Sequence, residues 1–226
     1  MVVRAVVFDL DGTLVSFNVD YRAIRADVLG LLSRQGLPRS IFSLREGVFD
    51  TLAKAELYMR NRGRGGQEFQ RVKESVLSVV VRHEMEAARA TVLVPGALET
   101  LKALRESGLR TALFTVNGEA PTNHILRRFR LGDLFDTVVT RESAPSVKPN
   151  PGHLEAVLGK LGVEPGEALV VGDSVHDVRC AVGLGVTAVG VATGISSPED
   201  LTRAGATRVI SSLTELPALV GQLGSS

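Results

Sequence analysis

Two hydrophobic patterns alternate along most of this 226-residue chain. Short apolar runs of strand length occur near residues 2–8, 110–115, 136–140, 168–171, 187–192 and 208–210. Between them, apolar residues recur at helical spacing near 97–107, 123–130, 151–161 and 175–184. Alternating strands and helices predict right-handed βαβ units around a parallel sheet. The first run is almost continuously apolar, which predicts a strand covered on both faces.

Residues 16–90 interrupt this alternation, because their apolar positions follow helical spacing only. We predict one helix from Tyr21 to a stop at Gly36, a second opening at Pro38 and Ser40, and a third carrying Phe69. The fold class predicted is therefore α/β, a doubly wound, Rossmann-like parallel sheet with an inserted all-helical module. Residues 1–15 and 91–226 form the sheet domain in this interpretation, and residues 16–90 form the insertion.

Composition narrows the class of protein but not its chemistry. The chain is 44% hydrophobic and 23% charged, which is typical of soluble globular proteins. A formal net charge of +1 indicates no strong attraction to nucleic acid or to a membrane surface. The single cysteine, Cys180, excludes an intrachain disulfide, and no basic leader or run of membrane-spanning length is present. We expect a cytoplasmic protein whose partner is a small molecule, and the oligomeric state stays open.

Polar residues follow the predicted strands at four places along the chain. They are Asp9 with Asp11, Thr115 with Asn117, Lys148, and Asp173 with Asp177. In open α/β sheets, ligands bind beyond the carboxyl ends of the strands. We therefore expect these side chains to converge at one edge of the sheet, although they are far apart in sequence.

Their chemical types fit phosphoryl transfer. Several carboxylates suit Mg²⁺, which takes oxygen ligands. The ion, a lysine and a threonine hydroxyl would offer positive charge and donors to phosphoryl oxygens. Rate enhancements up to ~10²¹ are known for phosphomonoester hydrolysis, and general acid–base help of roughly 10²–10⁴ cannot supply them. We therefore also expect a carboxylate nucleophile, which divides the displacement into two easier steps.

Four short motifs in this order resemble the haloacid dehalogenase superfamily in its phosphatase branch. The motifs are Asp9-Leu10-Asp11-Gly12-Thr13, Thr115 at a strand end, Lys148-Pro149, and Gly172-Asp173-Ser174-Val175-His176-Asp177. The chain looks most like phosphoglycolate-phosphatase-type members with a helical cap. The resemblance implies that Asp9 is a nucleophile forming an aspartyl-phosphate, and that Asp11 is general acid and then general base.

The resemblance also implies the remaining roles. Thr115 and Lys148 would hold the transferring phosphoryl group. Mg²⁺ would be bound by Asp9, the backbone carbonyl of Asp11, and Asp173, with Asp177 in the metal site as a residue that positions the ligands. Residues 16–90 would be the cap that reads the substrate.

The sequence leaves the roles of Asn117 and Asp177 open. Many relatives place Asn directly after the motif threonine, whereas Asn117 stands two residues after Thr115; we assign Asn117 to substrate binding and leave its role open. Asp177 could also cap the helix that follows it.

The sequence thus predicts a magnesium-dependent phosphatase acting on a small phosphorylated metabolite, phosphoglycolate or a similar phosphomonoester. A phosphomutase would share the first half-reaction and return the phosphoryl group to a sugar. A dehalogenase fits less well, because relatives with that activity generally lack the second aspartate. A non-catalytic phosphate-binding regulatory module is the alternative from another class of protein.

Overall fold

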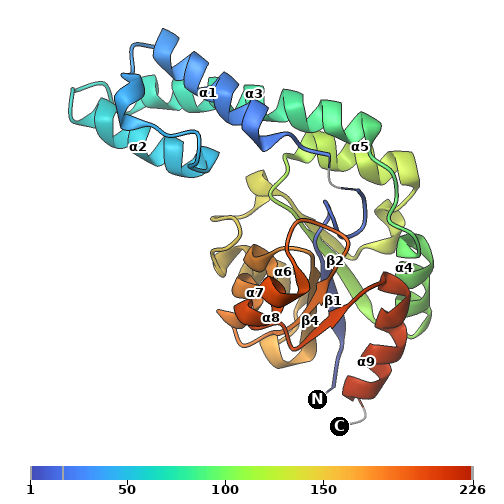
Figure 1. Ribbon diagram of the computed structural model, residues 1–226. Helices are drawn as coiled ribbons and strands as arrows, with labels where there is room; N and C mark the ends of the chain where they lie inside the picture. Colours follow the sequence, from blue (N-terminus) through green and yellow to red (C-terminus); the bar gives the residue numbers. More distant parts are fainter. Residues whose placement is uncertain (1, 17, 225–226) are drawn as a thin grey trace. The chain divides into compact units, whose positions relative to one another are not determined.

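The computed structural model describes residues 2–16 and 18–224, and the chain divides into two compact units. One unit is Met1–Asn18 with Ala88–Ser226, and the other is Val19–Ala87. The first is built on a six-stranded sheet with the order β3-β2-β1-β4-β5-β6. Figure 1 labels β1, β2 and β4 of this sheet. The strands are β1 (Ala5–Phe8), β2 (Arg110–Phe114), β3 (Thr137–Val139), β4 (Ala168–Gly172), β5 (Thr187–Val191) and β6 (Arg208–Ile210).

All neighbouring strands pair in parallel, and β1 lies at the centre. Phe8 at the end of β1 is level with Leu113 in β2 and with Val171 in β4. The chain fills one side of β1 with β2 and β3, and then the other side with β4, β5 and β6. Strand order therefore reverses at β1 and β4, which is where a doubly wound sheet opens a crevice at its carboxyl edge. The predicted fold class is confirmed.

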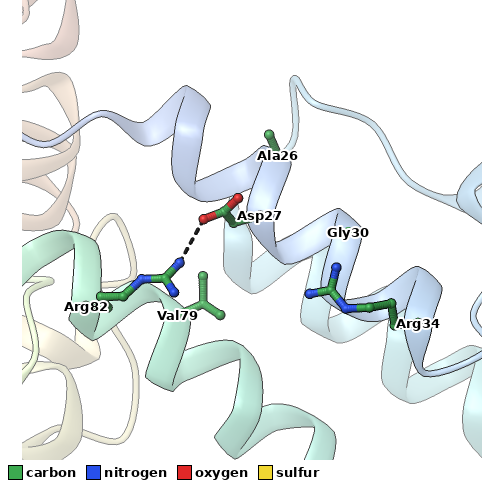
Figure 2. A pocket seen from close by; sticks show the side chains of 6 residues that line it. All are labelled: Ala26, Asp27, Gly30, Arg34, Val79 and Arg82. Carbon is green, nitrogen blue, oxygen red and sulfur yellow. Dashed lines mark hydrogen bonds and ion pairs between the residues drawn. The ribbon is translucent and has the colours of Figure 1, made fainter.

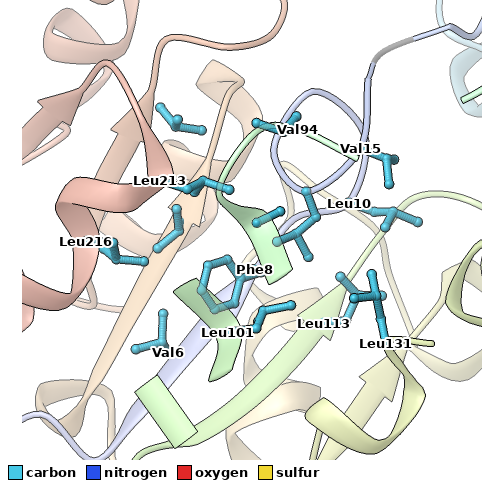
Figure 3. Packing of buried hydrophobic residues seen from close by; sticks show 14 of the residues in the cluster. Val6, Phe8, Leu10, Val15, Val94, Leu101, Leu113, Leu131, Leu213 and Leu216 are labelled. Carbon is cyan, nitrogen blue, oxygen red and sulfur yellow. The ribbon is translucent and has the colours of Figure 1, made fainter. Parts of the chain in front are cut away.

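Helices cover both faces of this sheet, and the side chains of β1 alternate between them. Val6 and Phe8 pack with residues of α4 (Ala97–Glu106), α5 (Glu119–Phe129) and α9 (Leu216–Gly224) (Figure 3). Ala5 and Val7 pack with residues of α6 (Gly152–Leu161), α7 (Val175–Val182) and α8 (Pro198–Ala204). The complete burial of Ala5–Phe8 follows from these two layers, as the continuous apolar run predicts.

The second unit is helical in its described residues. It contains α1 (Tyr21–Arg34), a 3₁₀ turn (Arg39–Ile41), α2 (Val48–Arg60) and most of α3 (Gln67–Ala90). The Asp20 side chain accepts hydrogen bonds from the first backbone N–H groups of α1 and fixes its start. Apolar residues buried on each helix supply this unit with its own core: Ile24, Val28 and Leu32 from α1, Leu52, Ala55 and Met59 from α2, and Val72, Val76 and Val80 from α3.

Three local predictions differ from the structure. The second helix begins at Val48 rather than at Pro38, because the segment before it makes only a 3₁₀ turn and leaves Leu44 48% exposed. Helix α5 begins at Glu119, earlier than predicted, and its Pro121 lies in the first turn, where no intrahelical donor is needed. Helices α8 and α9 were not predicted from the pattern. Among the described residues, no helix combines the length and the apolar character needed to cross a membrane.

Candidate active site

The sheet brings the sequence-predicted residues to its carboxyl edge. Asp9 follows β1, Thr115 follows β2, and Asp173 follows β4. Lys148 lies in the loop before α6, and Asp177 lies in the first turn of α7. All five side chains are buried, between 1% and 8% exposed by residue, so they form an internal polar cluster and not a surface patch.

Lys148 is the centre of this cluster. Its Nζ donates hydrogen bonds to Asp9 Oδ1, to Asp177 Oδ1 at 2.7 Å and to the Phe114 carbonyl oxygen at 3.2 Å. The ammonium also lies 4.1 Å from the centroid of the Phe114 ring. Burial alone would lower the pKa of Lys148, but the carboxylates of Asp177 and Asp9 raise it above its ordinary value. The lysine therefore stays charged at neutral pH.

Three carboxylates surround one small volume. Ligand oxygens of Asp9, Asp173 and Asp177 all lie within 4.8 Å of one another. Burial raises the pKa of Asp9 well above its ordinary value, Lys148 opposes this, and the neighbouring Asp177 and Asp173 add to it. Burial and then Asp177 raise the pKa of Asp173. One lysine does not neutralise three buried carboxylates, so their oxygen donors and excess negative charge fit a divalent cation.

Two glycines make room for Asp173. A Cβ on Gly12, which has φ +82°, would stand 2.4 Å from Asp173 Oδ2, and a Cβ on Gly194 would stand 1.8 Å from the same atom. That oxygen accepts a hydrogen bond from the Ile195 backbone N–H at 2.8 Å. The loop after β5, Thr193 to Ile195, therefore shapes the cluster, although it was not among the predicted site residues. A glycine just after a predicted strand was the signal available for it.

Thr13 is a second residue that was not assigned to the site, although it lies inside the first motif. Its hydroxyl is buried between two carboxylates, 3.5 Å from Asp9 Oδ2 and 3.3 Å from Asp173 Oδ1. Its single hydrogen can be donated to one of these two carboxylates at a time. Only the pairing of β1 with β4 brings the aspartates within reach of one hydroxyl.

Asp11 and Asn117 meet beside this cluster. Asn117 Nδ2 donates a hydrogen bond of 2.5 Å to Asp11 Oδ2, and the backbone N–H of Asn117 donates to Thr115 Oγ1 at 3.1 Å. The Thr115 hydroxyl accepts that bond, so its own hydrogen is available to a ligand oxygen. Asn117 is 2% exposed, and its Oδ1 has no hydrogen-bond partner within residues 2–16 and 18–224.

Asp177 does two things in this structure. Its Oδ1 accepts from Lys148, while its Oδ2 accepts from the Ser174 backbone N–H at 3.0 Å and from the Ser174 hydroxyl at 2.6 Å. Together with the bond from the Asp177 N–H back to Ser174 Oγ, these contacts form a capping box at the start of α7. Helix capping and contact with the lysine therefore occur together.

The helical unit contains a separate hollow of about 360 Å³ between α1 and α3 (Figure 2). Asp27 accepts from Arg82 Nη2 at 2.8 Å and is 2.9 Å from His83 Nε2. The hydrogen bond to His83 lowers the pKa of Asp27; loss of hydration opposes this, and the charges of Arg82 and Arg34 add to it. Asp27 is paired with Arg82 and His83, so this hollow has the character of a surface ion-pair cluster. It is lined by Ala26, Asp27, Gly30, Arg34, Val79 and Arg82.

Fold and cluster define a doubly wound α/β protein with a buried lysine and carboxylate site at the reversal of strand order. The family model of haloacid dehalogenase-like hydrolases matches residues 3–185, and the chain belongs to this family of enzymes. The resemblance inferred from the four motifs is thereby confirmed.

Curated relatives match along nearly the whole chain. A phosphoglycolate phosphatase of Pseudomonas fluorescens (strain Pf0-1) is 32% identical over 217 residues, covering 94% of this chain and 78% of that protein. A phosphoglycolate phosphatase of Nitrosospira multiformis is 30% identical over 219 residues, covering 96% of each. The crystal structure of a hydrolase from Pseudomonas syringae has a TM-score of 0.67 at 22% identity, covering 97% of this chain and 99% of that one; this likeness shows the fold alone.

Proposed function

We propose that this chain is a magnesium-dependent phosphatase that hydrolyses a small phosphomonoester, phosphoglycolate or a similar compound, through an aspartyl-phosphate on Asp9. The observation that carries the proposal is the buried contact of Lys148 with Asp9 and Asp177, in a cluster completed by Asp173. The names of the curated relatives support the substrate class.

In the first step of the proposed reaction, an Asp9 carboxylate oxygen attacks phosphorus. The bond from phosphorus to the ester oxygen breaks, and its electron pair goes to that oxygen, which takes a proton from Asp11. In the second step, Asp11 takes a proton from a water molecule as the water oxygen attacks phosphorus. The bond between phosphorus and Asp9 then breaks, which releases phosphate and restores both carboxyl groups.

Lys148 and Thr115 serve the transferred group in this proposal. The charge of Lys148 favours the ionised form of Asp9 against the effect of burial, and it offers donors to phosphoryl oxygens. Thr115 is 1% exposed and directly follows β2, and its backbone N–H donates to the Val139 carbonyl oxygen at 3.0 Å, so the position of its hydroxyl is fixed. These positioned donors stabilise the charge that develops on the phosphoryl oxygens.

The metal would be held by Asp9, Asp173 and the backbone carbonyl of Asp11. Asp177 would position these ligands in the same site. Its Oδ1 accepts from Lys148, which also contacts Asp9, and its Oδ2 accepts two hydrogen bonds from Ser174 at the start of α7, which supports a positioning role for it. When bound there, Mg²⁺ would supply positive charge that offsets the carboxylates and would polarise a phosphoryl oxygen. Residues 16–90, whose described helices are α1, α2 and α3, would form the cap that selects the substrate. A cytoplasmic location stays a prediction.

The purified chain should release inorganic phosphate from phosphoglycolate in the presence of Mg²⁺, and a panel of phosphorylated metabolites ranked by kcat/KM would identify the preferred ester. Asp9→Asn should lose about 10³-fold or more in kcat, because an amide cannot act as the nucleophile. Mass spectrometry of the quenched wild-type enzyme should detect one added phosphoryl group, which Asp9→Asn lacks.

Asp133→Asn is the matched control, because Asp133 is exposed and outside the cluster, and it should retain wild-type kcat. An Asp9→Asn variant with wild-type rates would overturn the nucleophile. Release of free phosphate from several unrelated esters would decide against a phosphomutase, whereas no release from any ester with Mg²⁺ present would favour a non-catalytic phosphate-binding module.

A further inference from the structure

The Asn117 side chain is turned toward the Asp11 carboxyl group. One N–H of its amide nitrogen donates to Asp11 Oδ2 at 2.5 Å. Its other polar atom, Oδ1, is an acceptor, and an acceptor repels the anionic oxygens of a phosphoryl group. We propose that Asn117 is a positioning residue, which holds the Asp11 carboxyl group in one orientation for proton transfer to the leaving group. The inference rests on the proposed function, in which Asp11 is the general acid.

The orientation of the amide suits both protonation states of Asp11. With the NH₂ side of Asn117 toward Asp11 Oδ2, that oxygen accepts a hydrogen bond whether the carboxyl group is ionised or carries its proton on Oδ1. The reversed amide would place Oδ1 against a carboxylate oxygen and lose the bond. Asn117 is 2% exposed, so water does not compete for its nitrogen as it would at the surface.

The backbone around Asn117 is held from two sides. Its N–H donates to the Thr115 hydroxyl at 3.1 Å, and its carbonyl oxygen accepts from the Arg141 N–H at 3.1 Å. The Arg141 guanidinium is buried and donates to the Val116 carbonyl oxygen at 2.9 Å. The loop after β2 is thus tied to the turn after β3, and the position of the Asn117 side chain is fixed before any substrate arrives.

A fixed carboxyl group matters most when the leaving group is a poor one. An aliphatic alcohol must receive a proton as the phosphorus–oxygen bond breaks, whereas p-nitrophenolate leaves without one. Loss of an Asn117 contact that acts through Asp11 should therefore slow aliphatic esters selectively. Loss of a contact that binds the phosphoryl group should slow both kinds of ester alike, because both carry the same group.

The test compares wild type, Asn117→Ala and Asn117→Asp on two substrates with Mg²⁺ present. One substrate is p-nitrophenyl phosphate, and the other is the aliphatic phosphomonoester with the highest kcat/KM in the metabolite panel. Asn117→Asp is almost the same size as the native residue and keeps its backbone contacts, but it replaces the donor by an acceptor. For both variants we expect kcat on the aliphatic ester to fall by roughly 10²-fold, with KM little changed, and kcat on p-nitrophenyl phosphate to fall much less.

The outcomes separate this inference from the proposed function. A wild-type enzyme that releases no phosphate from either ester contradicts the proposed function itself. An active wild type with equal losses of kcat on both esters would overturn the positioning role. A rise in KM for both esters at unchanged kcat would overturn it too, and would restore Asn117 as a substrate-binding residue.

Discussion

At the scale of single residues, the neighbouring charges decide whether a buried basic group stays charged. Lys148 stays charged because two carboxylates outweigh its loss of hydration. His153, in the first turn of α6, accepts a hydrogen bond from the Lys148 backbone N–H through Nδ1 at 3.2 Å and has no exposed surface. Burial, followed by the charge of Lys148, lowers the pKa of His153 to about 4.

This pKa makes stability depend on pH in a defined direction. Unfolded His153 takes up a proton near pH 6.5, whereas folded His153 does so only near its lowered pKa of about 4. Between those values the unfolded state binds more protons, so stability is complete above pH 6.5 and falls as pH is lowered toward 4. Between pH 7.5 and pH 5, the titration of His153 should lower the free energy of unfolding by about 2 kcal/mol.

Urea unfolding of wild type and His153→Asn at pH 7.5 and pH 5 measures the effect. The wild type should lose about 2 kcal/mol more than the variant over this interval, because asparagine does not titrate. His176→Asn is the matched control, since His176 is exposed in α7. Equal losses in wild type and His153→Asn would contradict the buried neutral histidine.

At the scale of elements, two segments that connect the units are joined to each other and to α5. Val15 and Leu93 form an antiparallel bridge, and the Ser16 hydroxyl lies 3.0 Å from the Thr91 hydroxyl. Arg128 Nη1 donates to the carbonyl oxygens of Ala88, Arg89 and Thr91 at 3.2, 2.9 and 2.8 Å. The last carbonyls of α3 lack intrahelical partners, and Arg128 supplies them with charged donors.

Arg128→Ala should lower the free energy of unfolding by about 1–2 kcal/mol, because three hydrogen bonds to one charged group are lost from a partly exposed place. Hydrogen exchange should show weaker protection at the C-terminal end of α3. Arg127→Ala is the matched control: Arg127 is the exposed neighbour and makes no side-chain hydrogen bond within the described part of the chain. Similar effects of both substitutions on α3 would show that Arg128 does not hold its end.

At the scale of the whole molecule, the sheet collects into one volume residues that are spread over most of the sequence. Asp9 and Ile195 lie far apart in the chain. In the folded protein, Asp9 and Asp173 belong to the same cluster, and the Ile195 N–H donates to Asp173. The arrangement leaves three buried carboxylates facing one lysine, which is costly without a further cation. A bound divalent ion should therefore stabilise the fold.

Addition of Mg²⁺ to metal-free protein should raise the free energy of unfolding, by about 2.7 kcal/mol when the ion is present at 100 times its Kd. Asp173→Asn should remove most of this increase, because it takes away one carboxylate of the cluster. Asp133→Asn should keep it. Thermal unfolding in EDTA and across a Mg²⁺ titration tests both expectations, and an unfolding temperature of the wild type that is independent of Mg²⁺ would contradict the metal site.

Part of this protein was predictable from its sequence, because some physical effects are local. The apolar run before Asp9, the helical spacing of Tyr21, Ile24 and Val28, and the polar residues after each strand are set by neighbours in the chain. The prediction from neighbouring residues was wrong at the start of the second helix. Pro38 and Ser40 look like a helix start, but the chain there forms only a 3₁₀ turn before α2.

Residue order alone was enough to predict the α/β class and the set of acidic, hydroxyl and basic residues that follow the strands, since strand periodicity and turn chemistry act over a few residues. Which of these side chains touch depends on how the strands are arranged in the folded protein. The bond from Asn117 to Asp11, the place of Thr13 between two aspartates and the room that Gly194 leaves for Asp173 all depend on strand order. Hydrogen bonds act over about 3 Å, so partners distant in the chain can meet only after the sheet has set their separation.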